Sequence, residues 1–175
     1  MPTPPCPPFS GHGIYLDEEG IELMLEHETF LVPTLVAPRA VLAAHERGLP
    51  VPEWALEKTR RVIDVDQENV ARAHRAGARC ALGTDSGVSL HGQNLAELAL
   101  LQEIGVSPMD AIVAGTRRGA EVMGLEGDLG TIKEGKLADL VLTDVDPRAS
   151  LASLSDPTRI RVVIQDGRVV KNLRG

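Results

Sequence analysis

Apolar and polar positions alternate in blocks along the chain, and each block has the spacing of a helix or a strand. Residues 17–27 place acidic residues before apolar positions at helical spacing, which predicts a short amphipathic helix. Residues 29–32 are nearly all apolar, as in a strand buried on both faces of a parallel sheet. Helical periodicity over residues 38–47 and 53–76 leads into a second apolar run that ends at Asp85. The order of strand, helices and strand predicts an α/β fold.

Two helix starts carry capping signals. Asp17 precedes the first predicted helix, and its side chain is suited to accept a main-chain N–H. Ser107 is the expected cap of a later helix, because Pro108 follows at the first helical position, where its missing N–H costs nothing. Residues 95–103 form another predicted helix, so the α/β pattern continues to about Gly124.

The chain beyond Gly124 has a different pattern, in which glycine-rich turns alternate with brief strands. Residues 161–165 and 168–171 flank Asp166-Gly167, a strong local signal for a hairpin, and a further strand is predicted at residues 138–143. The proline-rich start cannot form a helix or a paired strand. We therefore expect three parts, which are a disordered leader over residues 1–11, an α/β part over residues 12–124 and C-terminal strands over residues 125–175.

Charge and composition narrow the classes of partner. The net charge is −7 and lysines and arginines do not cluster, which argues against nucleic-acid binding and against adhesion to anionic membranes. No apolar run approaches the length of a membrane span, and the first residues do not have the pattern of a signal peptide. The two cysteines, Cys6 and Cys80, lack CxxC spacing. We expect a cytoplasmic protein with no nucleic-acid or membrane partner.

The tract Ala-Leu-Gly-Thr-Asp-Ser-Gly at residues 81–87 is the most informative one for chemistry. Its apolar half stops at Asp85 among turn-forming residues, so the predicted strand delivers a carboxylate to a loop. Functional groups of α/β enzymes lie where parallel strands end. Asp85 is therefore the leading candidate for a functional residue. The alternative is that Asp85 only caps the following turn.

Three regions of the chain resemble one protein family. Residues 130–142, Gly-Thr-Ile-Lys-Glu-Gly-Lys-Leu-Ala-Asp-Leu-Val-Leu, resemble the signature by which metal-dependent amidohydrolases enter a small β-sandwich after their barrel. Residues 82–87 and 91–98 are similar to the eighth barrel strand and helix of the imidazolonepropionase-like and Xaa-Pro dipeptidase-like branch. Residues 11–17 resemble the end of the sixth strand, although Gly11 replaces an acidic residue. The resemblance implies the C-terminal part of a TIM-like (β/α)8 barrel, about strands 6 to 8, followed by strands of a β-sandwich domain.

The resemblance also implies a site and a reaction. The family binds a divalent metal, zinc or a similar ion, and His12 and Asp85 match its sixth-strand histidine and eighth-strand aspartate. Asp85 would be a metal ligand and the general base toward a metal-activated water. The reaction would be hydrolysis of an amide (C–N) bond in a small molecule such as a dipeptide, an N-acyl amino acid or a cyclic amide. His91 is a candidate substrate contact, and the alternative is that it is a solvated loop residue.

The remaining metal ligands of the family have no counterpart in this chain. The family also uses a His-x-His pair, a lysine and another histidine on earlier strands, whereas this chain contains no His-x-His and has no lysine before Lys58. An alternative hypothesis is therefore a non-catalytic amidohydrolase fragment that serves as a structural or interaction module. A partial barrel leaves strand edges and apolar helix faces uncovered, so we expect a homo-oligomer or binding to a complementing chain.

Overall fold

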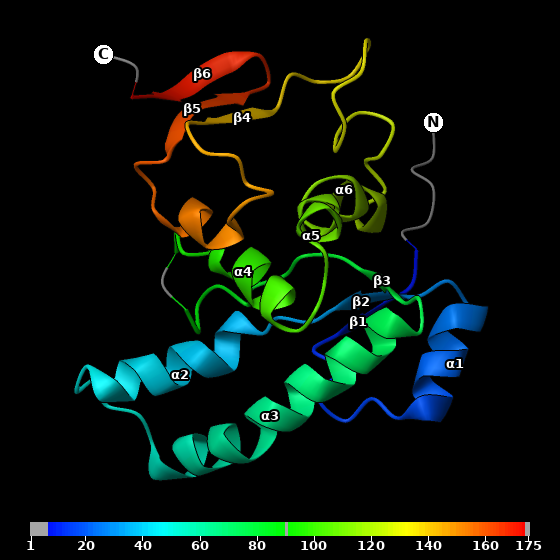
Figure 1. Cartoon of the computed structure of the whole chain (residues 1–175), viewed down its shortest axis with the longest axis vertical. Helices are drawn as coiled ribbons and strands as arrows, with labels where there is room; N and C mark the ends of the chain where they lie inside the picture. The colour runs from blue at the N-terminus through cyan, green and yellow to red at the C-terminus, as the bar shows by residue number, and fades with distance from the viewer. Residues whose placement is uncertain (1–6, 90, 174–175) are drawn as a thin grey trace.

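Two small sheets of three strands each form the framework of the protein (Figure 1). The structure is a computed structural model, and it describes residues 7–89 and 91–173. The first sheet is parallel, with its strands in the order β1 (Phe9–Gly11), β2 (Phe30–Val32) and β3 (Arg79–Cys80). The second is antiparallel and contains β4 (Leu140–Thr143), β5 (Ile160–Gln165) and β6 (Arg168–Asn172). The predicted α/β class is confirmed.

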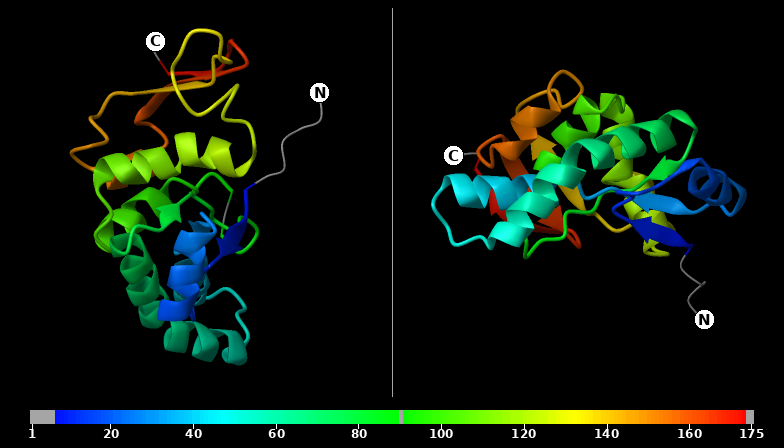
Figure 2. Two further views of the ribbon diagram at one scale, coloured as in Figure 1. Left: turned by 90° about the vertical axis from the view of Figure 1, so that its right-hand side faces the viewer. Right: turned by 90° about the horizontal axis from the view of Figure 1, so that it is seen from below.

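Helices pack around the parallel sheet. They are α1 (Glu18–Glu26), α2 (Val36–Glu46), α3 (Glu53–Arg75), α4 (Ala96–Glu103), α5 (Pro108–Ala114), α6 (Arg117–Val122) and the 3-10 helix η1 (Leu151–Ser155). In Figures 1 and 2, α1 to α3 lie on one side of the parallel sheet, and α4 to α6 lie between this sheet and the antiparallel one. No helix within residues 7–89 and 91–173 combines the length and apolar composition that crossing a membrane requires.

Strand β1 lies inside the range predicted to be a leader. Its residues pair with β2, with Ser10 opposite Leu31, and the N–H of Phe30 donates to the carbonyl of Pro8 at 2.9 Å. Proline lacks a donor but keeps its carbonyl acceptor, so it is compatible with the start of an edge strand. The predicted leader boundary at residue 11 is therefore corrected, because residues 9–11 are a strand. Residues 1–6 lie outside the described residues, and that part of the prediction stays a prediction.

The strand predicted to end at Asp85 is shorter than expected. The N–H of Ala81 still donates to the carbonyl of Leu31 at 2.9 Å, but the N–H of Leu82 donates to the carbonyl of Ala114 at 3.1 Å. That acceptor is the last residue of α5. Successive N–H groups of a strand point to opposite sides, so the Leu82 N–H faces away from β2 and finds its acceptor on α5. The β2–β3 pairing ends before Asp85, because the next β2 donor would be the N–H that Pro33 lacks.

Both predicted caps are confirmed. Asp17 Oδ1 accepts the N–H of Gly20 at 2.8 Å, and Ser107 Oγ accepts the N–H of Asp110 at 3.1 Å. Helix α2 begins at Val36, two positions before the predicted start, so Pro38 lies in its first turn. The first turn of a helix needs no intrahelical N–H donor, which is why proline is accepted there.

The predicted C-terminal hairpin is confirmed. Asp166 and Gly167 have φ angles of 49° and 72°, as a two-residue turn between twisted strands requires. Leu151 and Leu154 of η1 belong to the same hydrophobic cluster as Leu31 of the parallel sheet, and η1 packs against α4. The C-terminal residues therefore share one core with the α/β part.

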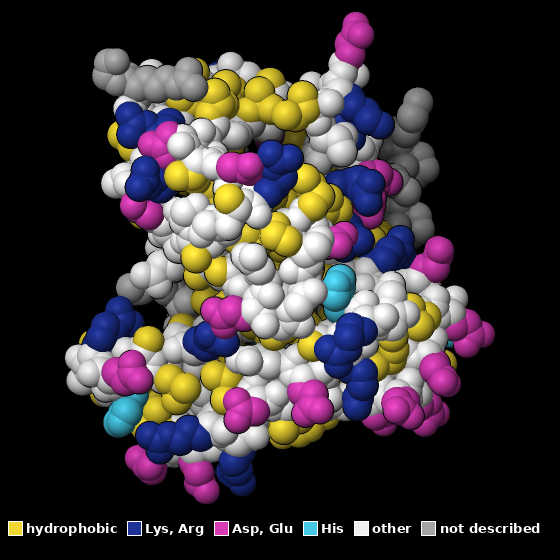
Figure 3. Space-filling model, in the orientation of Figure 1, with side chains coloured by type: hydrophobic (Ala, Val, Ile, Leu, Met, Phe, Trp, Pro, Cys, Tyr) yellow, Lys and Arg dark blue, Asp and Glu magenta, His cyan; other side chains and the backbone are white. Residues whose placement is uncertain are grey.

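The antiparallel sheet carries exposed apolar side chains. Val141, Val169 and Val170 have exposed fractions of 60%, 59% and 59%. Figure 3 shows hydrophobic side chains gathered along the top of the molecule, over β6. Exposed apolar groups that are contiguous, in contrast to isolated ones, are typical of interaction surfaces.

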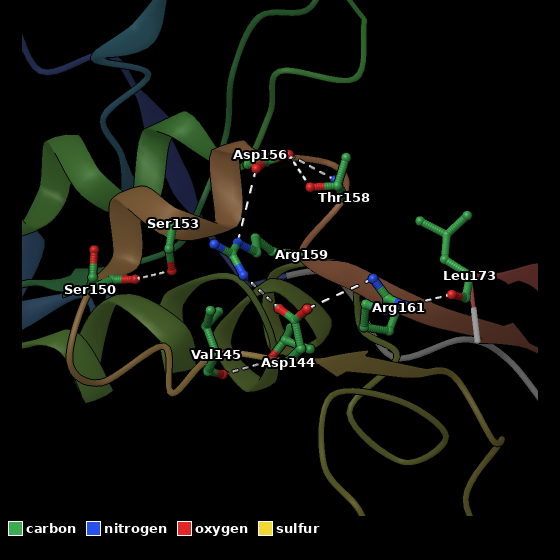
Figure 4. Close-up of polar contacts among 10 residues, drawn as sticks. Asp144, Val145, Ser150, Ser153, Asp156, Thr158, Arg159, Arg161 and Leu173 are labelled. Atoms are coloured by element: carbon green, nitrogen blue, oxygen red, sulfur yellow. Dashed lines mark hydrogen bonds and ion pairs between the residues drawn. The ribbon is translucent and has the colours of Figure 1, made fainter. Parts of the chain in front are cut away.

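An ion-pair cluster joins the end of β4 to β5. The carboxylate of Asp144 lies 3.6 Å from the guanidinium of Arg159 and 3.8 Å from that of Arg161 (Figure 4). Arg159 also approaches Asp156 at 4.0 Å, next to η1. These side chains are all about a third or more exposed, so each pair contributes only about 0–1 kcal/mol to stability.

Candidate functional site

Three residues with left-handed backbone conformations follow the three parallel strands. His12 comes directly after β1 with a φ of 70°, Thr34 follows β2 with a φ of 63°, and Asp85 follows β3 with a φ of 46°. Such φ angles are uncommon for residues other than glycine, and they concentrate at functional sites. Because the strands are parallel, their carboxyl ends meet at one edge of the sheet. This edge is the candidate site.

The end of β2 lies between the segment that leads to His12 and the segment that leads to Asp85. The N–H of His12 donates to the carbonyl of Val32 at 2.8 Å. On the other side, a Cβ placed on Gly83 would lie 2.3 Å from Val32 Cγ1 and 3.5 Å from Thr34 Oγ1. Neighbouring strands are about 4.8 Å apart, so the strands that lead to His12 and Asp85 are separated by about 10 Å. Any ligand shared by these two residues must lie over the end of β2.

The turn around Asp85 is held by its neighbours. The side-chain amide of Asn94 donates to Thr84 Oγ1 and to Ser86 Oγ, both at 2.9 Å, and the two hydroxyls are 3.0 Å apart. The N–H of Val88 donates to the main-chain carbonyl of Asp85 at 3.1 Å. In the described part of the chain no hydrogen bond reaches the Asp85 carboxylate. The capping alternative therefore has no supporting contact, and the exposed carboxylate is available to a ligand.

His12, Asp85 and His91 are all exposed. An imidazole and a carboxylate have the donor chemistry that zinc prefers, so His12 and Asp85 fit a metal as part of a ligand set. Among residues 7–89 and 91–173, no group of three or more His, Cys, Asp or Glu side chains could hold a metal ion. No contact in the described structure joins His91 to either residue, so its predicted role stays a prediction. The described part of the chain thus supplies at most two of the four donors of a tetrahedral zinc site.

Cys80 is not a candidate ligand. Its side chain is fully buried, and burial raises the pKa of its thiol to about 11. A thiol with that pKa and no access to solvent is inert near neutral pH.

Two buried carboxyl groups, those of Glu97 and Asp66, were not recognised from the sequence. Glu97 is fully buried in α4, where Oε1 accepts the N–H of Leu35 at 2.9 Å and Oε2 accepts the N–H of Val36 at 2.7 Å. Burial raises the pKa of Glu97 to about 7, although the two main-chain donors act in the opposite direction. Asp66 of α3 is also buried, which raises its pKa to about 7, and its Oδ1 has no hydrogen-bond partner in the described structure.

A signal for both acids was present in the sequence. Asp66 lies on the same helix face as Val62 and Val70, which are spaced as in an apolar stripe, and Glu97 sits beside Leu98 in a mainly apolar helix. An acid on the apolar face of a helix is expected to be buried. The sequence does not, however, indicate which distant amides such an acid would bind.

Comparison with known proteins agrees with this architecture. The model of the Amidohydrolase family matches residues 8–170. Ochratoxinase from Aspergillus niger is 30% identical over 162 residues, which cover 91% of this chain and 33% of that protein. A crystal structure of a Xaa-Pro dipeptidase with methionine in its active site has 32% sequence identity and a TM-score of 0.85, covering 94% of this chain and 40% of that one.

A more distantly related structure shares only its fold with this chain. The zinc-bound adenosine deaminase from Xanthomonas campestris has 18% identity and a TM-score of 0.62, over 95% of this chain and 37% of that one. The chain therefore spans between a third and two fifths of the length of these relatives. Because the family model covers almost the whole chain, the protein belongs to the amidohydrolase family.

Proposed function

We propose that this chain provides the His12 and Asp85 portion of a metal-dependent hydrolase that cleaves amide (C–N) bonds in small substrates. In this proposal β1, β2 and β3 correspond to about strands 6 to 8 of a TIM-like barrel, and the C-terminal strands belong to a β-sandwich domain. The observation that carries it is the pair of left-handed residues, His12 and Asp85, which follow the two strands that flank β2. A dipeptide, an N-acyl amino acid or a cyclic amide is the proposed substrate class, which the likeness to a Xaa-Pro dipeptidase supports.

The proposed roles follow from the chemistry of the side chains. His12 would hold a divalent metal, most simply zinc, through a neutral imidazole nitrogen, and Asp85 would hold it through a carboxylate oxygen. A metal held in this position would lower the pKa of a bound water toward neutrality and would polarise the scissile carbonyl. Asp85 would accept a proton from the attacking water and pass it to the leaving nitrogen. His91 is exposed on the loop between Asp85 and α4, from which it would contact the substrate.

Zinc binding by the purified chain tests the proposal. We expect Asp85→Ala and His12→Ala each to abolish zinc binding measured by calorimetry. Matched controls are Asp64→Ala and His45→Ala, because both residues are exposed on helices away from the sheet edge. Hydrolysis of dipeptides and N-acyl amino acids would then be assayed with the wild-type chain. Equal zinc affinity in the wild type and both site variants would refute the assignment of the ligands.

A second proposal is that the chain acts as a structural or interaction module that assembles with itself or with a complementing chain. An apolar groove supports it: a hollow of about 320 Å³ is lined by Phe9, Val32, Leu82 and Met123, among others. Phe9 is 60% exposed on the outer edge of the parallel sheet, where its strand pairs only with β2 among the described strands. Edge strands with apolar side chains are sites of strand addition.

Light scattering separates the two proposals when it is combined with the zinc measurement. The interaction module predicts an oligomer or a complex without metal, and Phe9→Asp should weaken the assembly. Val88→Asp is a matched control, because Val88 is 48% exposed and lies outside the groove. A monodisperse, stable monomer at high concentration would argue against the interaction module.

A further inference from the structure

We propose that the start of α4, through Asn94 just before the helix and Glu97 in its first turn, is the positioning element that holds the Asp85 loop against the loop after β2. This inference rests on the proposed function, because those two loops flank the candidate metal site. Asn94 and Glu97 would touch neither metal nor substrate. They would act by fixing the position of Asp85 relative to the end of β2, where the Val32 carbonyl accepts the N–H of His12.

Glu97 fixes the loop after β2. The two amides that it binds, those of Leu35 and Val36, begin α2 directly after the left-handed residue Thr34. Leu35 occupies the N-cap position of α2 but provides no side-chain cap. The carboxylate of Glu97 supplies this cap from another helix and satisfies two donors that an isolated helix start leaves unpaired. The position of Thr34 therefore depends on α4.

Asn94 fixes the loop after β3. Its side-chain amide donates to Thr84 and Ser86, the two neighbours of Asp85, and its Oδ1 accepts the N–H of Gly92 at 3.2 Å. A single side chain thus uses both its donor and its acceptor groups within this loop. Thr84 is only 7% exposed, so its hydroxyl has little access to water as an alternative partner.

The two loops are also in contact with each other. Gly83 packs so closely against Val32 and Thr34 that a methyl group would not fit there. Asn94 and Glu97 are also joined directly, because the main-chain N–H of Glu97 donates to the carbonyl of Asn94 at 3.2 Å. A disturbance of either side chain should therefore be transmitted to both loops. That mutual dependence distinguishes a positioning element from two unrelated stabilising contacts.

The test uses two conservative variants of the full chain, each with a control. Glu97→Gln keeps the size of the side chain but replaces one acceptor oxygen by a donor group, and Glu103→Gln makes the same change at an exposed position of α4. Asn94→Asp removes both side-chain donors, and Gln93→Glu adds the same charge at the exposed neighbour. For each variant, ¹H–¹⁵N spectra of the main-chain amides are recorded without metal, and zinc affinity is measured separately.

Each variant is expected to shift main-chain amides in both loops, including the loop that its side chain does not contact. Glu97→Gln should shift the amides of Thr84 and Ser86 as well as those of Leu35 and Val36. Asn94→Asp should likewise shift the Leu35 and Val36 amides, which it does not touch. Zinc affinity should fall by about 10-fold or more in both variants, as it does when residues that orient metal ligands are replaced. Neither control should reproduce these effects.

Shifts confined to the loop that each side chain contacts would overturn the inference. If the wild type binds no zinc, the proposed function fails, but the reciprocal amide shifts measured without metal still decide the inference. If Glu97→Gln does not fold, Asn94→Asp decides it alone, through the presence or absence of shifts at Leu35 and Val36. A folded variant could show reciprocal shifts and still bind zinc as tightly as the wild type. That result would overturn the role of Asn94 and Glu97 in positioning the metal ligands.

Discussion

The carboxylate of Glu97 accepts the main-chain N–H of Val36 at 2.7 Å, across 61 positions of the sequence. Its second oxygen accepts the adjacent N–H of Leu35 at 2.9 Å. A fully buried carboxylate thereby caps a helix that has no cap of its own. The stability of the loop after β2 and the stability of α4 are consequently linked.

Replacing Glu97 by Gln should destabilise the protein by about 1–3 kcal/mol, because the glutamine NH2 group would face a buried N–H donor. Urea unfolding followed by circular dichroism measures this free energy. Glu103 lies on the same helix as Glu97, is exposed and pairs with Arg39 of α2. Glu103→Gln should therefore cost less than about 1 kcal/mol. Equal unfolding free energies for Glu97→Gln and the wild type would contradict the capping role.

Asp66 should make stability fall as the pH rises. Burial raises its pKa from 3.8 to about 7, so the native state keeps a proton that the unfolded state releases between these values. The stability linked to this group is fully present below pH 3.8 and is lost as the pH rises to about 7. Glu97, whose pKa is raised from 4.5 to about 7, contributes in the same direction.

Asp66→Asn removes this titration, so the free energy of unfolding should depend less on pH between about 4 and 7. At pH 8 the variant should be more stable than the wild type by about 1–3 kcal/mol, since a buried carboxylate with an unpaired oxygen is removed. Urea unfolding at several pH values tests this expectation. Asp64→Asn, at an exposed position of the same helix, is the control. A parallel pH dependence in Asp66→Asn and the wild type would disprove it.

Gly83→Ala should destabilise the protein because its methyl group would lie 2.3 Å from Val32 Cγ1. Overpacking of this kind costs about 1–3 kcal/mol. Gly11→Ala is a suitable control, since no atom lies within 4 Å of the added methyl group. Val32→Ala in the same chain should recover part of the loss, and a double-mutant cycle of unfolding free energies measures the coupling. Strict additivity would show that the two residues are not in contact.

Asp144→Asn should cost less than about 1 kcal/mol, although Asp144 faces two arginines. The side chains are partly exposed, so water and salt screen the attraction, and the difference from the wild type should shrink further in 1 M NaCl. Thermal unfolding in low and high salt measures both effects. Asp128→Asn, an exposed residue outside this cluster, serves as the comparison. A loss above about 2 kcal/mol would mean that the cluster is more strongly desolvated than its exposure indicates.

The sequence by itself determined the features that depend on a few neighbouring residues. The caps at Asp17 and Ser107 and the turn at Asp166-Gly167 follow from side-chain donors and from backbone angles that only certain residues adopt. The apolar run at residues 29–32 likewise predicted β2, because burial on both faces requires continuous apolar character. The motif around Asp85 and the amidohydrolase signature at residues 130–142 identified the family.

Only the tertiary structure decided how distant segments are combined at the edge of the sheet. Strand β1 forms despite the preceding prolines because β2 supplies its partners, and the N–H of Leu82, which faces away from β2, finds its acceptor at Ala114 of α5. The hydrogen bond between Glu97 and the N–H of Val36 in α2 joins residues 61 positions apart, and no local sequence pattern specifies such a pairing. Local patterns set which backbone conformations are accessible. Buried polar groups, in contrast, form hydrogen bonds with whichever partners the packed chain brings within reach.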